Sequence, residues 1–286
     1  MKKLIIAMSV VLLSFIFLFL ATKEDHMIND NIDQYKETKA TPTVEKQRKT
    51  EPIINKSIQE KYAKIIVPEG LVAYYPFNGN ARDESKNSND GIVTNAVLTK
   101  DRFGSPNSAY YFDGKNSEII CGNDISLDLN RTLTVSVRFL VNKYSNKFSP
   151  ILYKGWIRGS RNVYNGTERT YSLWLENSGL LHLSSADSRG HEYINSRSGI
   201  IQLNKWYHYI GVIDRANGIM ESYLDGKLIA SVKIRKSISV STLKPLLIGS
   251  SYEKYNKFSN FNGIISDVQI YNRHLTQEEI LELFNE

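Results

Sequence analysis

Oxygen-bearing side chains crowd one short stretch of the sequence, where they could hold a cation. The segment YYPFNGNARDESKNSNDG, residues 74–91, follows a strand-like aromatic run with Asn, Asp, Ser and Gly. Calcium takes about six to eight oxygen ligands from carboxylates, amides, backbone carbonyls and water. Asn and Asp also hydrogen-bond their own backbone in turns. A solvated loop built on such turns is therefore the alternative interpretation.

Residue patterns for catalysis are missing from the same sequence. His182, His191, His208 and His274 accompany neither a Gly-x-Ser-x-Gly elbow nor a His-Glu-x-x-His helix. Glycoside hydrolysis needs two carboxylates about 5 to 10 Å apart. The nearest spacing, Glu221 and Asp225, places Asp225 in a predicted turn. We expect no catalytic residue, and an unrecognised glycoside hydrolase is the third functional interpretation.

Three long stretches combine aromatic and polar residues in the way that sugar-binding surfaces do. They are KGWIRGSRNVYNGTERTY (154–171), ADSRGHEYINSRSG (186–199) and SYEKYNKFSNFNG (251–263). Aromatic rings can stack on sugar rings, and Arg, His and Asn side chains can bond hydroxyls or carboxylates. The candidate ligand-binding residues are Trp156, Arg158, Tyr164, His191, Tyr193 and Tyr255. Alternatively, Trp156 and Tyr193 cover an edge of the fold. Trp174 could face the concave surface of a sheet or pack in the core.

Short strands must position these residues. In LTVSVRFLV, residues 133–141, apolar side chains alternate with Thr134, Ser136 and Arg138, which is the period of a half-buried strand. KWYHYIGVID, residues 205–214, is apolar on both faces, so both should be covered. Asp225-Gly226 predicts a tight hairpin turn, and Asn177-Ser178-Gly179 predicts a second hairpin.

The C-terminal segment LTQEEILELFNE is the one helical pattern of the folded region. Thr276 can cap it while Glu279 reaches back, and Leu275 can pack on Ile280. On the strand before it, strict alternation places two sets of side chains on opposite faces: Ile264, Ser266, Val268 and Ile270 against Ile265, Asp267, Gln269 and Tyr271. Many short strands without strand–helix alternation predict an all-β, two-sheet antiparallel sandwich with a short C-terminal helix.

The N-terminal region predicts a membrane anchor and a tether. Lys2 and Lys3 precede about 18 apolar or small residues, enough for a spanning helix. We therefore expect residues 1–21 to be a signal-anchor, or transmembrane helix, with cleavage and secretion as the alternative. The basic N-terminus should stay cytoplasmic and leave the rest extracytoplasmic. Residues 22–64 are polar and predict a largely disordered linker, with a small helical domain as the alternative. We expect residues 65–286 to form the sandwich.

Composition excludes some classes of function. The net charge of +6 comes without a Lys/Arg-rich run or an aromatic RNA-binding motif, so we expect no nucleic-acid partner. Cys121 is the single cysteine of the sequence, which rules out an intrachain disulfide and a cysteine-based zinc site.

Five segments resemble, in the same order, the laminin G-like, concanavalin A-like lectin/glucanase jelly-roll family that is common in bacterial surface proteins. They are LVAYYPFNGNARDESKNSNDG, SAYYFDGKNSEI, KWYHYIGVID, SYLDGKLI and FNGIISDVQIYNRHLTQEEILELF. The resemblance implies two curved antiparallel sheets and a concave face or rim that often carries ligand. This fold hosts lectins, adhesion modules and glycosidases, so it does not imply one activity. The Glu-x-Asp-x-x-Glu strand of laminarinase-type enzymes is not found in the sequence.

The resemblance also implies one structural calcium ion (Ca2+). In such sandwiches calcium commonly joins an early loop, a following turn and an aspartate of the last strand, which suggests Asn78, Asp83, Asp113 and Asp267 as ligands. Lys86 departs from the family pattern, which usually has glycine after the serine. The alternative is that these side chains only cap turns.

Together these patterns predict a membrane-anchored, extracytoplasmic module that recognises a carbohydrate without catalysis. The expected partners are a glycan or a cell-surface or extracellular protein, and the membrane through the N-terminal helix. A protein–protein adhesion or scaffold module is the second interpretation.

Overall fold

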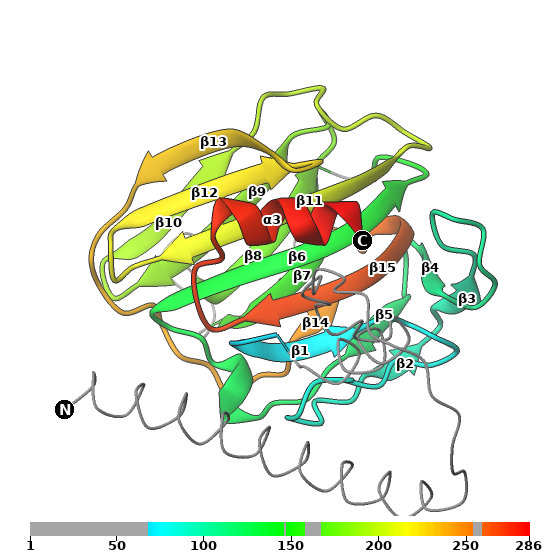
Figure 1. Ribbon diagram of the computed structural model, residues 1–286, viewed down its shortest axis with the longest axis horizontal. Helices are drawn as coiled ribbons and strands as arrows, with labels where there is room; N and C mark the ends of the chain where they lie inside the picture. Colours follow the sequence, from blue (N-terminus) through cyan, green and yellow to red (C-terminus); the bar gives the residue numbers. More distant parts are fainter. Residues whose placement is uncertain (1–67, 146, 158–166, 254–258) are drawn as a thin grey trace, which may run out of the picture. The chain divides into compact units, whose positions relative to one another are not determined.

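The computed structural model describes residues 68–145, 147–157, 167–253 and 259–286 (Figure 1). The chain divides into two compact units, Met1–Lys56 and Ser57–Glu286. The predicted N-terminal anchor and the linker lie outside the described residues. Within the described ranges, no helix is both long and apolar enough to cross a membrane.

Sheet A runs in the order β13-β12-β11-β6-β15-β4-β3, and β1 also pairs with β15. Every pairing in it is antiparallel. Its strands are β1 (Leu71–Tyr75), β3 (Val97–Thr99), β4 (Ala109–Asp113), β6 (Thr132–Val141), β11 (Trp206–Asp214), β12 (Ile219–Leu224), β13 (Lys227–Lys233) and β15 (Asn262–Tyr271).

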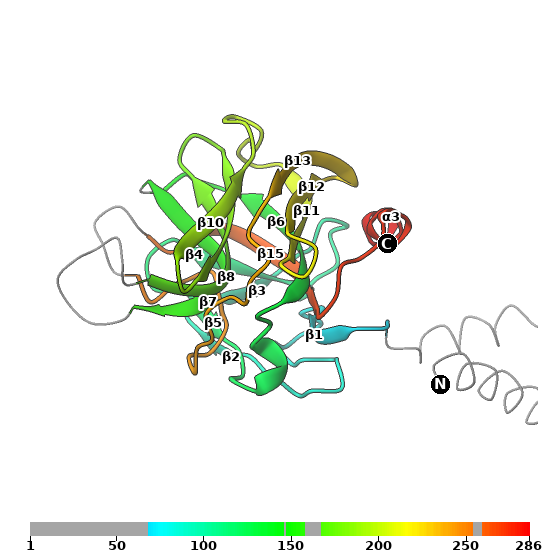
Figure 2. The same cartoon turned by 90° about the vertical axis from the view of Figure 1, so that its left-hand side faces the viewer.

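Sheet B runs in the order β10-β9-β8-β7-β14-β5-β2, and it is antiparallel as well. Its strands are β2 (Ile92–Thr94), β5 (Glu118–Ile120), β7 (Phe148–Ile157), β8 (Thr167–Glu176), β9 (Leu181–Asp187), β10 (Gly190–Asn195) and β14 (Leu247–Ile248). Short helices lie at η1 (Ile125–Leu127) and α3 (Gln277–Asn285). The two-sheet sandwich predicted for this region is confirmed (Figures 1 and 2).

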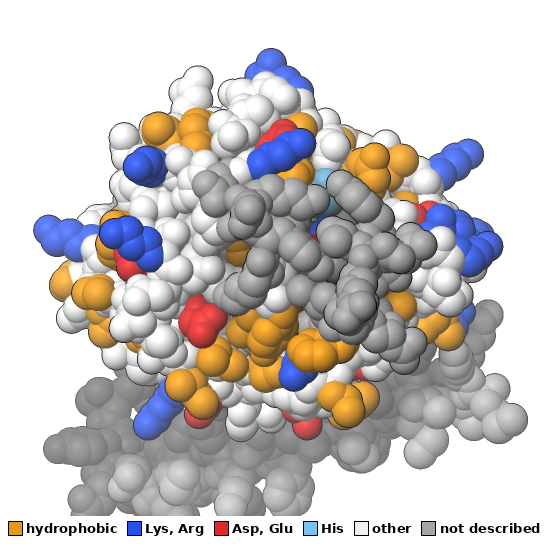
Figure 3. Space-filling view, turned by 180° about the vertical axis from the view of Figure 1, so that it is seen from behind, with side chains coloured by type: hydrophobic (Ala, Val, Ile, Leu, Met, Phe, Trp, Pro, Cys, Tyr) orange, Lys and Arg blue, Asp and Glu red, His pale blue; other side chains and the backbone are white. Residues whose placement is uncertain are grey.

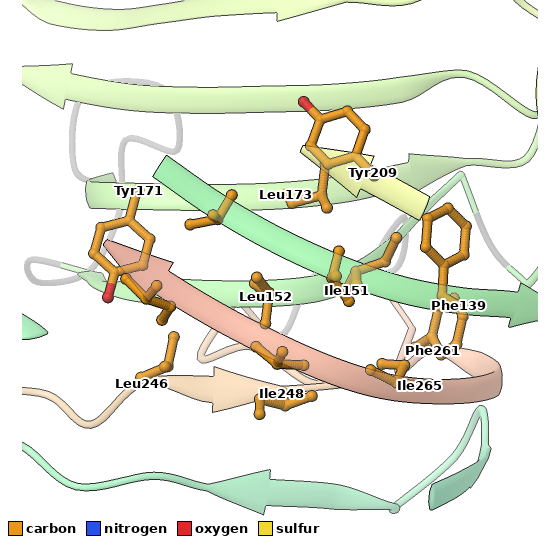
Figure 4. Close-up of a cluster of buried hydrophobic side chains, with 14 of the residues drawn as sticks. Phe139, Ile151, Leu152, Tyr171, Leu173, Tyr209, Leu246, Ile248, Phe261 and Ile265 are labelled. Carbon is orange, nitrogen blue, oxygen red and sulfur yellow. The ribbon is translucent and has the colours of Figure 1, made fainter. Parts of the chain in front are cut away.

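The main core lies between the two sheets. On β6, the alternation predicted from sequence is confirmed, because Leu133, Val135, Val137, Phe139 and Val141 are all buried. Figure 4 shows Phe139 and Ile265 of sheet A beside Ile151, Leu152 and Leu173 of sheet B. Burial of this apolar surface is the main force that holds the sheets together.

Helix α3 covers part of the outer face of sheet A (Figure 2). Its predicted capping box is present: the Thr276 hydroxyl accepts from the Glu279 N–H, and the Glu279 carboxylate accepts from the Thr276 N–H. A second apolar cluster lies beneath it, made of Leu71, Ile210, Val212, Tyr223, Tyr271, Leu275, Ile280 and Leu283. β11 therefore has both faces covered, as its sequence predicted.

The predicted side-chain faces of β15 are wrong at one end of the strand. Ile265, Val268 and Ile270 all lie in the main core, whereas strict alternation separates the first from the other two. The pairing of β15 with β6 shifts between Ser266 and Gln269, and Asp267 has φ of 46°. An inserted residue of this kind is a β-bulge, which reverses the faces on either side of it.

Both predicted hairpins are present. Asp225 and Gly226 have φ of 49° and 73° and connect β12 to β13, as the tight hairpin turn requires. Asn177, Ser178 and Gly179 connect β8 to β9, with φ of 73° at Gly179.

Candidate ligand-binding face

The strand register identifies the side chains on the outer face of sheet B. Direct cross-strand partners lie on the same face of a sheet. Leu173 and Leu183 pair with each other and belong to the main core, so their neighbours point outward. Two outward rows result: Trp174, His182 and Asn195 form one, and Tyr153, Ser172, Ser184 and Tyr193 form the other.

A cluster of mostly aromatic side chains lies at the centre of this face, and we call it the aromatic floor. Tyr153, Trp174 and Leu247 form a cluster separate from the main core, with Ile120, Phe148 and Tyr252 packed against it. The Tyr153 and Trp174 ring centroids are 5.6 Å apart at an interplanar angle of 82°. Trp174 thus lies on the outer face, although only 1% of it is exposed.

A buried ion pair lies on the floor. The Arg169 guanidinium donates to both carboxylate oxygens of Glu253, at 2.6 and 2.7 Å, and lies 4.9 Å from the Trp174 ring centroid. Bidentate geometry of this kind gives strong, charge-assisted hydrogen bonds. The positive charge of Arg169 and the negative charge of Glu253 neutralise each other. Burial, with the nearby Glu253 charge as a smaller cause, raises the pKa of Tyr153 far above its ordinary value.

Trp156 and Lys244 stand at one end of the face. Trp156 is 37% exposed, and its ring lies 6.3 Å from the ring of Tyr252. The Lys244 ammonium lies 4.0 Å from the Trp156 ring centroid and 5.7 Å from that of Tyr252, which is cation–π geometry. Lys154 holds the segment that carries Lys244 in place, since the Lys154 ammonium donates to the Lys244 carbonyl at 2.6 Å. Burial lowers the pKa of Lys154 to about 8.

Tyr193 and His182 stand at the other end. Their ring centroids are 5.1 Å apart, and Tyr193 is 55% exposed. His182 Nδ1 lies 2.7 Å from the Asn195 Oδ1, which can only accept, so Nδ1 carries the proton and Nε2 is an acceptor. Burial lowers the pKa of His182 to about 4, against the opposing hydrogen bond with Asn195. The imidazole is therefore neutral near pH 7.

The structure brings part of the predicted binding set together on this face. Trp156 and Tyr193 occupy its two ends, and His191 lies on β10 two residues before Tyr193, on the same side of the strand. Arg158, Tyr164 and Tyr255 lie outside the described residues. Figure 3 views this side of the domain and shows hydrophobic, basic and acidic side chains interspersed on its described part.

Sequence reasoning missed several residues of the face. Tyr153, Tyr252 and Lys244 come from three separate segments, and no motif links them. The alternation of Tyr153 with Leu152 was the available signal, but both residues are apolar enough for a core, so the pattern could not say which faces out.

Each predicted calcium ligand has hydrogen-bond partners of its own. The Asp83 carboxylate accepts from the N–H groups of Tyr74, Ser85 and Asn89 and from the Ser85 hydroxyl, at 2.8 to 2.9 Å. One Asp113 oxygen accepts from the N–H groups of residues 115–117 and from the Ser117 hydroxyl. The Asn78 carbonyl accepts from the Asn80 amide at 3.2 Å.

Asp267 is paired with arginine on the outer face of sheet A. Its Oδ2 lies 2.8 Å from Arg102 and 3.8 Å from Arg138. Burial raises the pKa of Asp267, although both arginines oppose the shift. Across the described ranges, no three His, Cys, Asp or Glu residues are grouped so as to hold a metal ion. The calcium site stays a prediction.

Solved structures with this fold include several toxin domains. The botulinum neurotoxin DC binding domain, in complex with rat synaptotagmin II, has a TM-score of 0.56 at 18% identity, covering 76% of this chain and 51% of that one. The botulinum neurotoxin serotype D ligand-binding domain, in complex with N-acetylneuraminic acid, has a TM-score of 0.58 at 17% identity, covering 76% and 50%. This chain thus spans about half the length of these structures, and the likeness shows the fold alone.

Two further comparisons concern the sequence. No curated protein matches it. Residues 113–281 match the Laminin_G_3 family, described as the concanavalin A-like lectin/glucanases superfamily. That match covers more than half of the 286 residues and most of the strands described above. The chain therefore belongs to the laminin G-like family of the concanavalin A-like lectin/glucanases superfamily.

Proposed function

We propose that this chain is a carbohydrate-binding module without catalytic activity, and that the outer face of sheet B holds the glycan. The observation that carries the proposal is the pair of exposed rings, Trp156 and Tyr193, at opposite ends of one face. Aromatic rings, hydroxyls and a neutral histidine lie between them. β7 and β10 are three strand spacings apart, about 14 Å, which suits an oligosaccharide better than a single sugar.

Two of the comparisons support binding rather than catalysis, whereas the family description covers both lectins and glucanases. The similar solved structures are binding domains, and their complexes contain N-acetylneuraminic acid in one case and synaptotagmin II in another. A protein partner is therefore the second candidate for the same module.

Retention on immobilised polysaccharides and oligosaccharide arrays tests the glycan proposal. We expect Trp156→Ala and Tyr193→Ala each to weaken retention about tenfold, because a stacked ring contributes about 1–1.5 kcal/mol. Phe103→Ala is the matched control, since Phe103 is 70% exposed but lies in the loop between β3 and β4 of sheet A. Unchanged retention in both variants would remove the proposed glycan face and favour a protein partner. Steady release of reducing ends from a retained polysaccharide would contradict the absence of catalysis.

The membrane anchor and the extracytoplasmic location are also proposals. They rest on the apolar run of residues 4–21 and on the lysines that precede it. We expect the full chain to stay in the membrane fraction after alkaline carbonate washing, and added protease to reach the sandwich from outside intact cells. Release of the full chain by carbonate would contradict the anchor.

A further inference from the structure

One hydrogen-bonded pair of side chains, His182 and Asn195, lies at the Tyr193 end of the outer face of sheet B. The two residues are direct cross-strand partners on β9 and β10, and β10 is an edge strand of the sheet. Their bond joins His182 Nδ1 to Asn195 Oδ1 at 2.7 Å. Asn195 is exposed and His182 is partly exposed, so a ligand can contact both side chains.

The ring of His182 is held from two sides. The Tyr193 ring centroid lies 5.1 Å from that of His182 at an interplanar angle of 32°, and the Phe148 ring centroid lies 5.9 Å away at 61°. Together with the bond to Asn195, these contacts fix the orientation of the imidazole. A ligand that binds there meets groups that are already in place, which lowers the entropy cost of binding.

The pair presents one acceptor and one donor beyond the bond that its members share. Nδ1 of His182 carries the proton, so Nε2 has a free lone pair, and the Asn195 Nδ2 keeps its two N–H groups. Within the described ranges, neither His182 Nε2 nor Asn195 Nδ2 has a hydrogen-bond partner. Burial lowers the pKa of His182 to about 4, so Nε2 stays an acceptor near pH 7. A well-matched ligand therefore offers a donor to one atom and an acceptor to the other.

Two neighbouring hydroxyls of a sugar ring meet both requirements. A hydroxyl both donates and accepts, so one of the two can donate to His182 Nε2 while the other accepts from Asn195 Nδ2. An ionised carboxylate only accepts, and it would place its lone pairs against that of Nε2. Tyr193 is 55% exposed and adds an aromatic ring on which the apolar side of a sugar can pack.

We infer that His182 and Asn195 form a subsite that binds an uncharged sugar through two neighbouring hydroxyls. This subsite rests on the proposed function, and it specifies the kind of sugar that the Tyr193 end of the face accepts. The Trp156 end, where the Lys244 ammonium lies over the ring, is a separate contact without this restriction.

Retention of the full chain, in detergent, on an oligosaccharide array tests the subsite. The probes are linear oligosaccharides of glucose, mannose and galactose, each beside its uronic-acid counterpart. We expect stronger retention on at least one neutral series than on its uronic-acid counterpart. His182→Phe, which keeps a ring between Phe148 and Tyr193, and Asn195→Leu should each weaken that retention about fivefold, because each removes one hydrogen bond.

A double variant separates one shared subsite from two independent contacts. His182 and Asn195 orient each other, so His182→Phe combined with Asn195→Leu should weaken retention by less than the product of the single effects, about 25-fold. The effect of Trp156→Ala, at the other end of the face, should multiply with that of either single variant. Asn142→Leu is the matched control and should leave retention unchanged. Asn142 is also exposed and bonded to one side chain, that of Asn204, but it follows β6 of sheet A.

Nitrogen-15 NMR of the histidine side chains gives a readout that a structural role alone would not move. The spectrum of His182→Phe assigns the His182 signals by their loss. In the free chain, Nε2 should have the chemical shift of an unprotonated ring nitrogen. Titration with the best-retained oligosaccharide of the array should move the Nε2 signal towards that of a hydrogen-bonded nitrogen. An Nε2 signal that does not move at saturation would contradict the contact.

Three results on the array would also overturn the inference. Equal or stronger retention on every uronic-acid series would contradict the choice of an uncharged sugar. Weaker retention of Trp156→Ala and Tyr193→Ala, with unchanged retention of His182→Phe and Asn195→Leu, would leave the proposed glycan face in place and remove this subsite. A chain that is retained on no oligosaccharide of any series would contradict the proposed function and the subsite together.

Discussion

His208 combines nearly complete burial with a titratable ring. It is 4% exposed, its Nε2 is hydrogen-bonded to the Ser136 hydroxyl at 2.7 Å, and its Nδ1 has no hydrogen-bond partner. Burial, aided by Arg138 and Arg102, lowers the pKa of His208 to about 3. The folded protein therefore keeps this imidazole neutral through the range in which an unfolded chain takes up a proton.

Stability should consequently fall as the solution becomes mildly acidic. The unfolded chain binds a proton at His208 below about pH 6.5, whereas the folded chain does so only near 3, so the free energy of unfolding decreases as pH falls through this window. Between about pH 7 and 5 we expect His208 to account for about 2 kcal/mol, measured by urea unfolding. His208→Gln should remove that part of the slope. Parallel slopes in the two proteins would contradict the assignment. Carboxylates such as Glu279, whose pKa Arg273 lowers to about 2, titrate below this range.

The Asp83 carboxylate already accepts four hydrogen bonds. These bonds use the acceptor sites through which the carboxylate would bind a metal ion. We propose calcium at Asn78, Asp83, Asp113 and Asp267 on the family pattern, and we expect chelation to lower the melting temperature by several degrees. Calcium at a hundredfold excess over its dissociation constant would add about 2.7 kcal/mol. Asp83→Ala should abolish the response. If the variant is destabilised equally with calcium and with chelator, Asp83 acts only as a hydrogen-bond acceptor for its loop.

At the scale of elements, two neighbouring residues of α3 differ in burial. Ile280 is fully buried against sheet A, while Leu281 is 42% exposed. We expect Ile280→Ala to lower the free energy of unfolding by about 2–5 kcal/mol, because it leaves a cavity under the helix. Leu281→Ala, the matched control, should change it by less than about 0.5 kcal/mol. Both values come from urea unfolding monitored by circular dichroism. Similar losses in the two variants would mean that the helix is not held by the face assigned here.

The elements also show which local patterns can be read from sequence. The Thr276–Glu279 capping box and the Asp225-Gly226 turn are encoded within a few residues, so both predictions are confirmed. The faces of β15 were mispredicted because a bulge at Asp267 has no comparable local signal: Asp tolerates positive φ but does not require it. A single inserted residue reverses an otherwise regular period.

At the scale of the molecule, the fold was predictable and the candidate ligand-binding face only partly so. Alternation, turns and the family segments indicate the sandwich. Trp156 and Tyr193 were singled out because their residue type is unusual in a polar stretch, and their part in binding stays a prediction. Lys244 and Tyr252 meet Trp156 from about 90 residues away, and that meeting depends on how the 243–252 segment follows β13. No single-sequence pattern contains this information.

The position of β15 sets the order in which the domain can be completed. This strand lies between β6 on one side and β4 and β1 on the other, yet it is the last strand of the chain. β1 therefore has no partner strand until residues 268–271 have been synthesised. Until then sheet A stays divided, because β15 is the strand that joins β6 to β4 and β1. Such non-local pairing is intrinsically slow to form. Joining the two parts of sheet A is therefore the slow step that this topology builds into folding.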